Sequence, residues 1–300
     1  MSESPIQHVS DTAFMVAAYR ALESERPDPL FRDPLAARLV GEHGRKIIAH
    51  LPRWTLLVSW SVVIRTHIID RLIEAAIAEG MDTILNLGTG LDTRPYRLDL
   101  PASLRWIEVD FPDVIDLKES KLAGDTPRCR LERVKLDLSD AAERKRFLAK
   151  VAADSPKVLV LTEGVIPYLS PEDVADLARD LNSSASFRYW IADYFSPESY
   201  RFRRRQGMAQ AMKNAPFRFE PADFFGFFRE HGWQPKEIRY TAEEADQLRR
   251  PVPLPWLKRL WYGIVTSVMS AERRAATKRY MGYVLFEPLA ATNDYCRGGK

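Results

Sequence analysis

The chain has 300 residues, of which 46% are hydrophobic and 28% charged, and its net charge is only +3. This composition is typical of one large globular domain, and the small net charge gives no indication of nucleic acid as a partner. The two cysteines, Cys129 and Cys296, lie far apart in the sequence. They predict neither a disulfide framework nor a metal site, so a cytoplasmic location is expected.

The N-terminal third of the chain shows helical periodicity. Residues 12–22 predict a first helix, a second begins at Pro34 and is expected to stop near Gly41, and residues 55–79 predict a long third helix. The longest apolar stretch, residues 54–64, is shorter than the roughly 20 residues that a membrane-spanning helix needs. We therefore expect a buried helix there and no integral membrane association.

After Gly80 the pattern changes to short apolar segments that alternate with helical ones. The predicted strands are residues 81–88, 104–110, 131–137, 157–164 and 187–194, and the predicted helices are residues 112–122, 141–152 and 171–181. This alternation predicts βαβ units in an α/β fold with a doubly wound, Rossmann-like and mostly parallel sheet. Residues 234–240 and 278–288 add two strands, compatible with an antiparallel closing pair.

The chain is expected to form a single domain of residues 1–300 in three parts. Residues 1–80 are predicted to be a helical cap over the acceptor, and residues 81–195 the cofactor-binding core. Residues 196–300 are predicted to hold the closing strands and helical inserts, at residues 196–225 and 254–269.

The first predicted strand ends in a glycine-containing loop, residues 86–94. Gly88 and Gly90 allow a tight turn and let a ligand approach the backbone closely. A dinucleotide fingerprint requires a third glycine, and Thr93 stands at that position, so a pyrophosphate is the weaker hypothesis. A G-x-G pair is equally consistent with a simple turn between a strand and a helix.

Acidic residues also follow the next predicted strands. Asp110 comes about 20 residues after the glycine loop, where an acid can accept both hydroxyls of a ribose. The alternative is that Asp110 caps the following helix, although Asp113 can do so equally well. Asp137, with Leu138, could hold an adenine amino group, and Asp140 or Ser139 would then cap the next helix.

Glu163 ends the fourth predicted strand, where an unpaired carboxylate would be costly to bury. It could therefore pair with a ligand ammonium group or with an arginine. Each of these acids has a structural alternative when it is considered singly. Their position at successive strand ends favours one shared ligand crevice, because ligands of open α/β sheets bind beyond the carboxyl ends of the strands.

Three motifs carry a resemblance to a known family: LNLGTGLDTRPYRLDLP, WIEVDFPDVIDLK and LVLTEGVIPYLSPEDV. With the entry segment VSDTAFMVAAYRALESERPDPLFRDPLAARLV, they resemble the leucine carboxyl methyltransferase family, including its bacterial polyketide O-methyltransferases. The likeness is close over residues 10–190, and LGTGLDTR and TEGVIPYL are its specific segments. It implies a seven-stranded class I methyltransferase that uses S-adenosyl-L-methionine (SAM).

The resemblance also implies roles for individual residues. Gly88 would contact SAM, Asp110 would bind its ribose, and Glu163 would face its methionine part. The adenine would lie against Asp137 and Leu138. Arg65 would clasp the methionine carboxylate, a task that suits the planar guanidinium group.

The expected reaction is methyl transfer to an oxygen acceptor, most simply a carboxylate of a small molecule or peptide. A carboxylate is already nucleophilic, so no obligatory catalytic residue is predicted. A phenol or alcohol would need a general base, and Asp193 or His231 are the candidates. His231 before Gly232 also has the plain interpretation of a helix-terminal residue.

Tyr168 and Tyr194 are candidates for lining the acceptor pocket, although as aromatic residues they are equally ordinary packing groups. Two functions of other classes remain as alternatives. One is an NAD(P)-dependent oxidoreductase, and the other is a SAM-binding module without turnover. An oxidoreductase would bind NAD(P), whereas a methyltransferase and a SAM-binding module would both bind SAM. Only the methyltransferase would form S-adenosylhomocysteine when given its acceptor.

Overall fold

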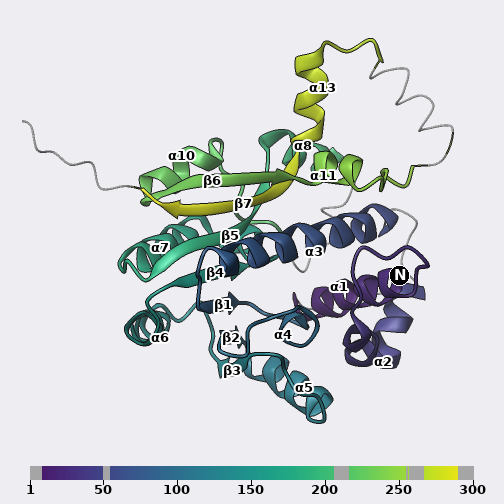
Figure 1. Cartoon of the computed structure of the whole chain (residues 1–300). Helices are drawn as coiled ribbons and strands as arrows, with labels where there is room; N and C mark the ends of the chain where they lie inside the picture. The colour runs from purple at the N-terminus through teal and green to yellow at the C-terminus, as the bar shows by residue number, and fades with distance from the viewer. Residues whose placement is uncertain (1–8, 50–54, 206–215, 255, 257–266, 290–300) are drawn as a thin grey trace, which may run out of the picture.

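The computed structural model describes residues 9–49, 55–205, 216–254, 256 and 267–289. Its centre is a seven-stranded sheet with the order β3-β2-β1-β4-β5-β7-β6 (Figure 1). The strands are β1 (Thr83–Leu87), β2 (Arg105–Asp110), β3 (Arg130–Lys135), β4 (Val158–Thr162), β5 (Phe187–Phe195), β6 (Trp233–Tyr240) and β7 (Met281–Pro288). The pairs among β1 to β5 are parallel, whereas β7 runs antiparallel to both β5 and β6. The predicted doubly wound, mostly parallel sheet is therefore confirmed.

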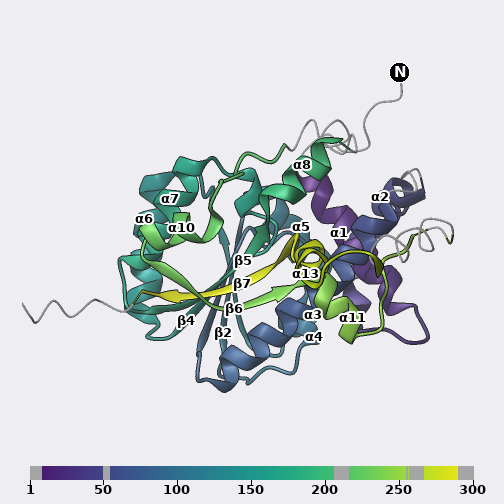
Figure 2. The same ribbon diagram turned by 90° about the horizontal axis from the view of Figure 1, so that it is seen from above.

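Helices cover both faces of the sheet (Figure 2). One face carries α3 (Thr55–Ala78), the short α4 (Arg94–Arg97) and α11 (Thr241–Gln247). The other face carries α6 (Ala141–Asp154), α7 (Pro171–Asn182) and α10 (Phe224–Glu230). The boundaries follow local signals: Asp140 caps α6 through the amides of Ala142 and Glu143, and Ser170 forms a capping box with Asp173.

The N-terminal helices α1 (Val9–Ser24) and α2 (Pro34–Ala49) pack together beside the carboxyl ends of β1 and β4 (Figure 1). Arg20 of α1 donates a hydrogen bond to the Leu91 carbonyl at 2.5 Å, which fixes α1 to the loop after β1. Gly41, at φ 55°, interrupts α2 as predicted, but the chain becomes helical again and continues to Ala49. The predicted interruption at Gly41 is thus present, but the prediction that the helix ends there is wrong.

The start of α3 is less buried than its apolar sequence predicts. Leu56 is 55% exposed, and the first buried residue after it in the helix is Val62. None of the described helices is long and apolar enough to cross a membrane. Helix α5 (Pro112–Leu122) packs against α2, while α8 (Pro197–Arg205) and α13 (Ala271–Lys278) belong to the C-terminal part. Residues 206–215, 255 and 257–266 of the predicted inserts lie outside the described residues.

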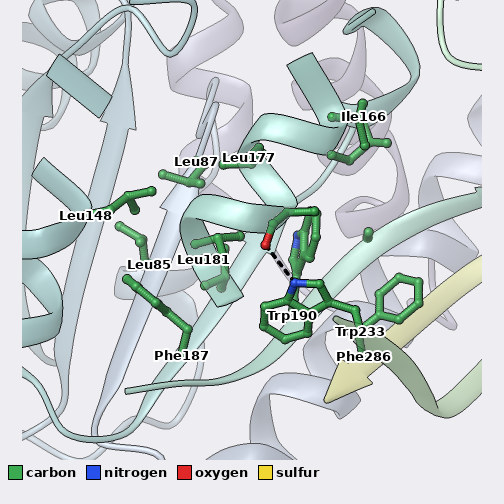
Figure 3. Packing of buried hydrophobic residues seen from close by; sticks show 14 of the residues in the cluster. Leu85, Leu87, Leu148, Ile166, Leu177, Leu181, Phe187, Trp190, Trp233 and Phe286 are labelled. Carbon is green, nitrogen blue, oxygen red and sulfur yellow. Dashed lines mark hydrogen bonds between the residues drawn. The ribbon is translucent and has the colours of Figure 1, made fainter. Parts of the chain in front are cut away.

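The face under α7 and α10 is filled by aliphatic side chains and by several large aromatic ones (Figure 3). The Trp190 ring lies 5.5 Å from that of Trp233 and 5.2 Å from that of Phe228, centroid to centroid. Each indole N–H has a partner, since Trp233 donates to the Ala178 carbonyl and Trp190 to the Thr162 hydroxyl, both at 2.9 Å. This face therefore satisfies its few polar atoms and packs the remainder as apolar core.

Candidate functional site

The loop after β1 makes a turn that only glycine fits. Gly88 has φ 68°, and a Cβ atom there would lie 2.5 Å from a methyl carbon of Val165. Gly90 has φ 49° and lies under α1, where a Cβ atom would approach that of Ala13 at 3.3 Å. Both glycines therefore have a structural reason, and they leave the backbone of this loop bare at the carboxyl edge of the sheet.

Asp110, at the end of β2, faces this loop. Its Oδ2 atom accepts a hydrogen bond from the Gly90 amide at 2.6 Å, and its Oδ1 atom accepts one from the Phe111 amide at 2.8 Å. Burial raises the pKa of the Asp110 carboxyl, and these two amides oppose that rise. Phe111, with no side-chain cap, precedes α5, and Asp113 lies inside the first turn, so the capping role we considered for Asp113 is not seen.

Asp137 and Leu138 lie in the loop after β3. Asp137 is exposed, and its Oδ1 atom accepts hydrogen bonds from the amide and the hydroxyl of Ser139 at 2.8 and 2.7 Å. The Leu138 carbonyl accepts a hydrogen bond from Arg144 at 2.7 Å. Asp137 therefore stabilises its own turn, which is the structural alternative to a role in binding adenine.

Glu163, directly after β4, pairs with two arginines. Its Oε1 atom lies 2.7 Å from Nε of Arg65 in α3, and its Oε2 atom accepts a hydrogen bond from Arg94 at 2.7 Å. Burial alone would raise the pKa of Glu163, but the positive charges of Arg94 and Arg65 hold it below its ordinary value. The Arg65 and Glu163 side chains remain 14% and 13% exposed, so neither is fully enclosed.

Arg94 is a central residue of this site that the sequence did not single out. Its side chain is 3% exposed and donates hydrogen bonds to Asp70 at 2.7 Å and Asp92 at 2.8 Å, besides Glu163. Arg97 forms two further hydrogen bonds with Asp70, at 2.7 and 2.8 Å. The signal that could have found it is its place in the LGTGLDTR motif, one residue before a proline that opens a helix.

Asp193 lies within β5, which ends one residue later than the expected strand end. Its Oδ2 atom accepts a hydrogen bond from the Gly164 amide at 2.7 Å. Burial is the main cause that raises its pKa to about 6, against the opposing charge of Arg65. The structure thus brings Asp193 beside Arg65 and Glu163.

The two candidate pocket tyrosines lie in different surroundings. Tyr168, half-buried after β4, meets the Phe217 ring edge to face at 5.3 Å. Tyr194 stacks on Phe225 at 5.2 Å, on the sheet face that carries α10. Tyr168 therefore lies near the end of β4, where Glu163 is, while Tyr194 takes part in core packing.

His231 is the C-terminal cap of α10, and its Nδ1 atom lies 2.7 Å from the Phe227 carbonyl. The next residue, Gly232, packs against Asn182 at the end of α7, which leads into the start of β5. His231 therefore lies at the amino edge of the parallel strands, and the structure does not bring it near Asp110 or Glu163 at the carboxyl edge.

The sequence of the chain matches the family model for leucine carboxyl methyltransferase over residues 13–182, more than half of its length. The chain belongs to the leucine carboxyl methyltransferase family. The matched segment contains the glycine loop, Asp110 and the Arg65–Glu163 pair, and it ends before Asp193.

Similar proteins are known from several actinobacteria. A protein of Parafrankia sp. is 33% identical over 82% of this chain and 83% of its own length, and one of Streptomyces avermitilis is 34% identical over 81% and 89%. Both are provisionally named S-adenosyl-L-methionine-dependent methyltransferases. A crystal structure of a provisionally assigned methyltransferase from Thermobifida fusca shares the fold, with a TM-score of 0.55 and 16% identity over 96% of this chain and 97% of that one.

The geometry of this family member does not suit a dinucleotide pyrophosphate. Such a group binds the free amides at the start of a long helix. Here α4 has only four residues, and the Arg94 amide already donates to the Asp92 carboxylate at 2.9 Å. A negatively charged side chain therefore occupies the place that a phosphate would take.

Proposed function

We propose that this chain transfers the methyl group of SAM to an oxygen atom, and that this oxygen belongs to a carboxylate of a small molecule or peptide. Methyltransferase activity and SAM as the cofactor follow from the family and from relatives that are named for both. The identity of the acceptor oxygen is our own inference, because fold and family do not determine a substrate.

The observation that carries the proposal is the pattern of charge along the carboxyl edge of the sheet. Asp110 offers a carboxylate at the end of β2, beside the glycine loop, and we expect it to accept the two hydroxyls of a ribose. At the end of β4, Arg65 and Glu163 present a cation and an anion side by side. A nucleoside joined to an amino acid has this same order of groups, with a diol at one end and a carboxylate and an ammonium at the other.

The residues around the end of β4 support a carboxylate acceptor. SAM supplies a methyl group on a positively charged sulfur, and an ionised acceptor oxygen needs no base to attack it. The nearby carboxylates of Glu163 and Asp193 are engaged by arginines and by the Gly164 amide. The residues of this chain would then act by orienting both substrates and excluding water, which can supply roughly 7–11 kcal/mol.

Transfer to a phenol or alcohol is the second candidate, and one observation favours it. The Asp193 carboxyl has its pKa raised to about 6, which is close to the value that suits a general base. Its bond from the Gly164 amide competes with that role, because a proton acceptor needs a free oxygen directed at the substrate.

Calorimetric titration with S-adenosylhomocysteine, with NADH titrated in parallel, tests the cofactor. We expect micromolar binding of S-adenosylhomocysteine alone. Binding of NADH alone would replace the proposal by the oxidoreductase alternative. If neither ligand binds the folded protein, freed of copurified ligand, the assignment fails.

Transfer of a labelled methyl group from SAM to a panel of carboxylic acids and phenols tests the acceptor. A carboxylate product is a methyl ester and loses its label in mild alkali, whereas a methyl ether keeps it. We expect alkali-labile label, and a rate that is level once the acceptor acid is ionised. Alkali-stable label, formed at a rate that falls below about pH 6 and is lost in Asp193→Asn, would favour the hydroxyl alternative.

A further inference from the structure

Arg65 is held from the strands beneath it as well as from Glu163. It lies midway along α3, which packs on β5 and β7. The Tyr283 hydroxyl of β7 and the Asp193 carboxyl of β5 both lie close enough to its guanidinium group to act on its charge. The flexible Arg65 side chain therefore faces residues of β5 and β7 as well as Glu163, directly after β4.

Tyr283 and Asp193 are direct neighbours across the sheet. They oppose one another in the antiparallel pairing of β5 with β7, so their side chains leave the sheet on the same face, toward α3. Both residues are 3% exposed and do not reach solvent. The position of these two side chains is consequently set by backbone pairing.

Asp193 also fixes the other half of the Arg65–Glu163 pair. Its Oδ2 atom accepts the hydrogen bond from Gly164, the residue that follows Glu163, and Gly164 has φ 68°. The turn that carries Glu163 is thus tied to β5, while the arginine that faces Glu163 is tied to β7. Asp193 and Tyr283 both lie outside the segment that the family model matches, residues 13–182.

We propose that Tyr283 and Asp193 are positioning residues that hold Arg65 and the Glu163 turn in the geometry that binds the methionine end of the cofactor. This inference rests on the proposed function. Neither residue needs to touch the cofactor: Tyr283 orients the guanidinium group, and Asp193 orients the turn and balances the guanidinium charge. Without them Arg65 would have to be ordered by the ligand itself, at a cost in affinity.

Two ligands that differ only at the methionine end test the proposal. S-adenosylhomocysteine carries the carboxylate and the ammonium group, and 5′-methylthioadenosine has the same nucleoside and thioether without them. We expect Tyr283→Phe to weaken binding of S-adenosylhomocysteine about tenfold, the scale of one hydrogen bond to a charged group. Asp193→Asn, which can still accept from Gly164, should weaken it by a smaller factor, and both variants should bind 5′-methylthioadenosine as the wild type does.

Tyr189→Phe is the matched control, because Tyr189 also lies on β5 but donates its hydroxyl to exposed Glu79. It should leave both affinities unchanged. Unchanged binding of S-adenosylhomocysteine in a folded Tyr283→Phe protein, or an equal loss for both ligands, would overturn the positioning role. Failure of the wild type to bind S-adenosylhomocysteine is a different result and would remove the proposed function itself.

Discussion

The two faces of the sheet are buried by different chemistry. Under α7 and α10 the aliphatic core contains a cluster of aromatic rings, in which Phe228 and Phe286 lie with their ring centroids 4.5 Å apart. Under α3 an apolar core of similar extent ends, at the carboxyl edge, in buried charges such as Arg94 and Asp70. Burial of charge is costly unless every partner is present. We therefore expect the second face to couple stability to cofactor binding, and the first to contribute stability without that coupling.

Removal of the Arg94 guanidinium group should show the coupling between stability and cofactor binding most strongly. Arg94→Ala leaves Asp70, Asp92 and Glu163 without a shared partner, and we expect a loss of about 3–5 kcal/mol in the free energy of unfolding. Binding of S-adenosylhomocysteine should weaken as well. Urea denaturation and calorimetry measure the two effects. Arg71→Ala, which breaks only an exposed pair with Glu74, should cost no more than about 1 kcal/mol. Similar losses in the two variants would contradict the coupling.

Truncation of an aromatic side chain under α7 and α10 should lower stability without changing cofactor affinity. Phe228→Ala removes a fully buried ring and should cost about 3–5 kcal/mol of unfolding free energy. The affinity for S-adenosylhomocysteine, measured under conditions where the variant is folded, should be that of the wild type. A tenfold change in affinity would show that the two faces are not independent.

Asp110→Ala tests the ribose end of the crevice. Loss of a carboxylate that accepts two hydroxyls should cost about 1.5–3 kcal/mol of binding, or roughly 10- to 150-fold in the dissociation constant. In contrast to the variants of Tyr283, this one should weaken S-adenosylhomocysteine and 5′-methylthioadenosine alike. We would abandon the ribose role if a folded Asp110→Ala protein bound both ligands normally.

A methyl group at Gly88 should destabilise the loop that lies between Asp110 and the Arg65–Glu163 pair. Gly88→Ala forces an L-residue into φ 68° and brings its Cβ atom against Val165, so we expect a loss of about 1–2 kcal/mol from the backbone alone. Gly124→Ala is the control, because no atom lies within 4 Å of the new methyl group. Equal stability of the two variants in thermal unfolding would refute the strain.

The smallest effect concerns pH. The pKa of Asp193 is raised from 3.8 to about 6, so its protonated form stabilises the fold below the unfolded value, and this contribution is lost as the pH rises through 6. Arg65 from α3, Glu163 from β4 and Tyr283 from β7 face it. Between pH 5 and 7 the wild type should lose about 1 kcal/mol relative to Asp193→Asn. A constant difference between the two proteins in urea denaturation would exclude the raised pKa.

Much of the fold could be predicted because each element carries its own signal. Pro112 and Pro171 open α5 and α7 where expected, and the five apolar segments after Gly80 are all strands. The short helix α4 was missed, since four residues show no periodicity. The turn held by Asp137 was also missed, although an aspartate two residues before a serine is a typical signal for it.

The cofactor-facing end of the site could be predicted only in part. Asp110 and Glu163 were expected at the ligand edge because they stand at strand ends, and the structure places both at the carboxyl edge of the sheet. Their roles toward SAM stay predictions. The cluster that Arg94 forms with Asp70 and Glu163 was not predicted, because these two acids lie 24 and 69 residues from Arg94 in the sequence. On its own helix or loop each of these residues resembles an ordinary surface charge, and only the folded sheet brings them together.

The place of β7 in the sheet has a consequence for the order in which the site is completed. β7 lies between β5 and β6, so β6 cannot join the sheet until the later strand has been inserted. A ribosome synthesises β7 after every other strand described here, and Tyr283 arrives with it. A nascent chain can therefore assemble the glycine loop and Asp110 well before the methionine end is ready. If Tyr283 positions Arg65 as proposed, the chain reaches its full affinity for the cofactor only after β7 has been synthesised and inserted.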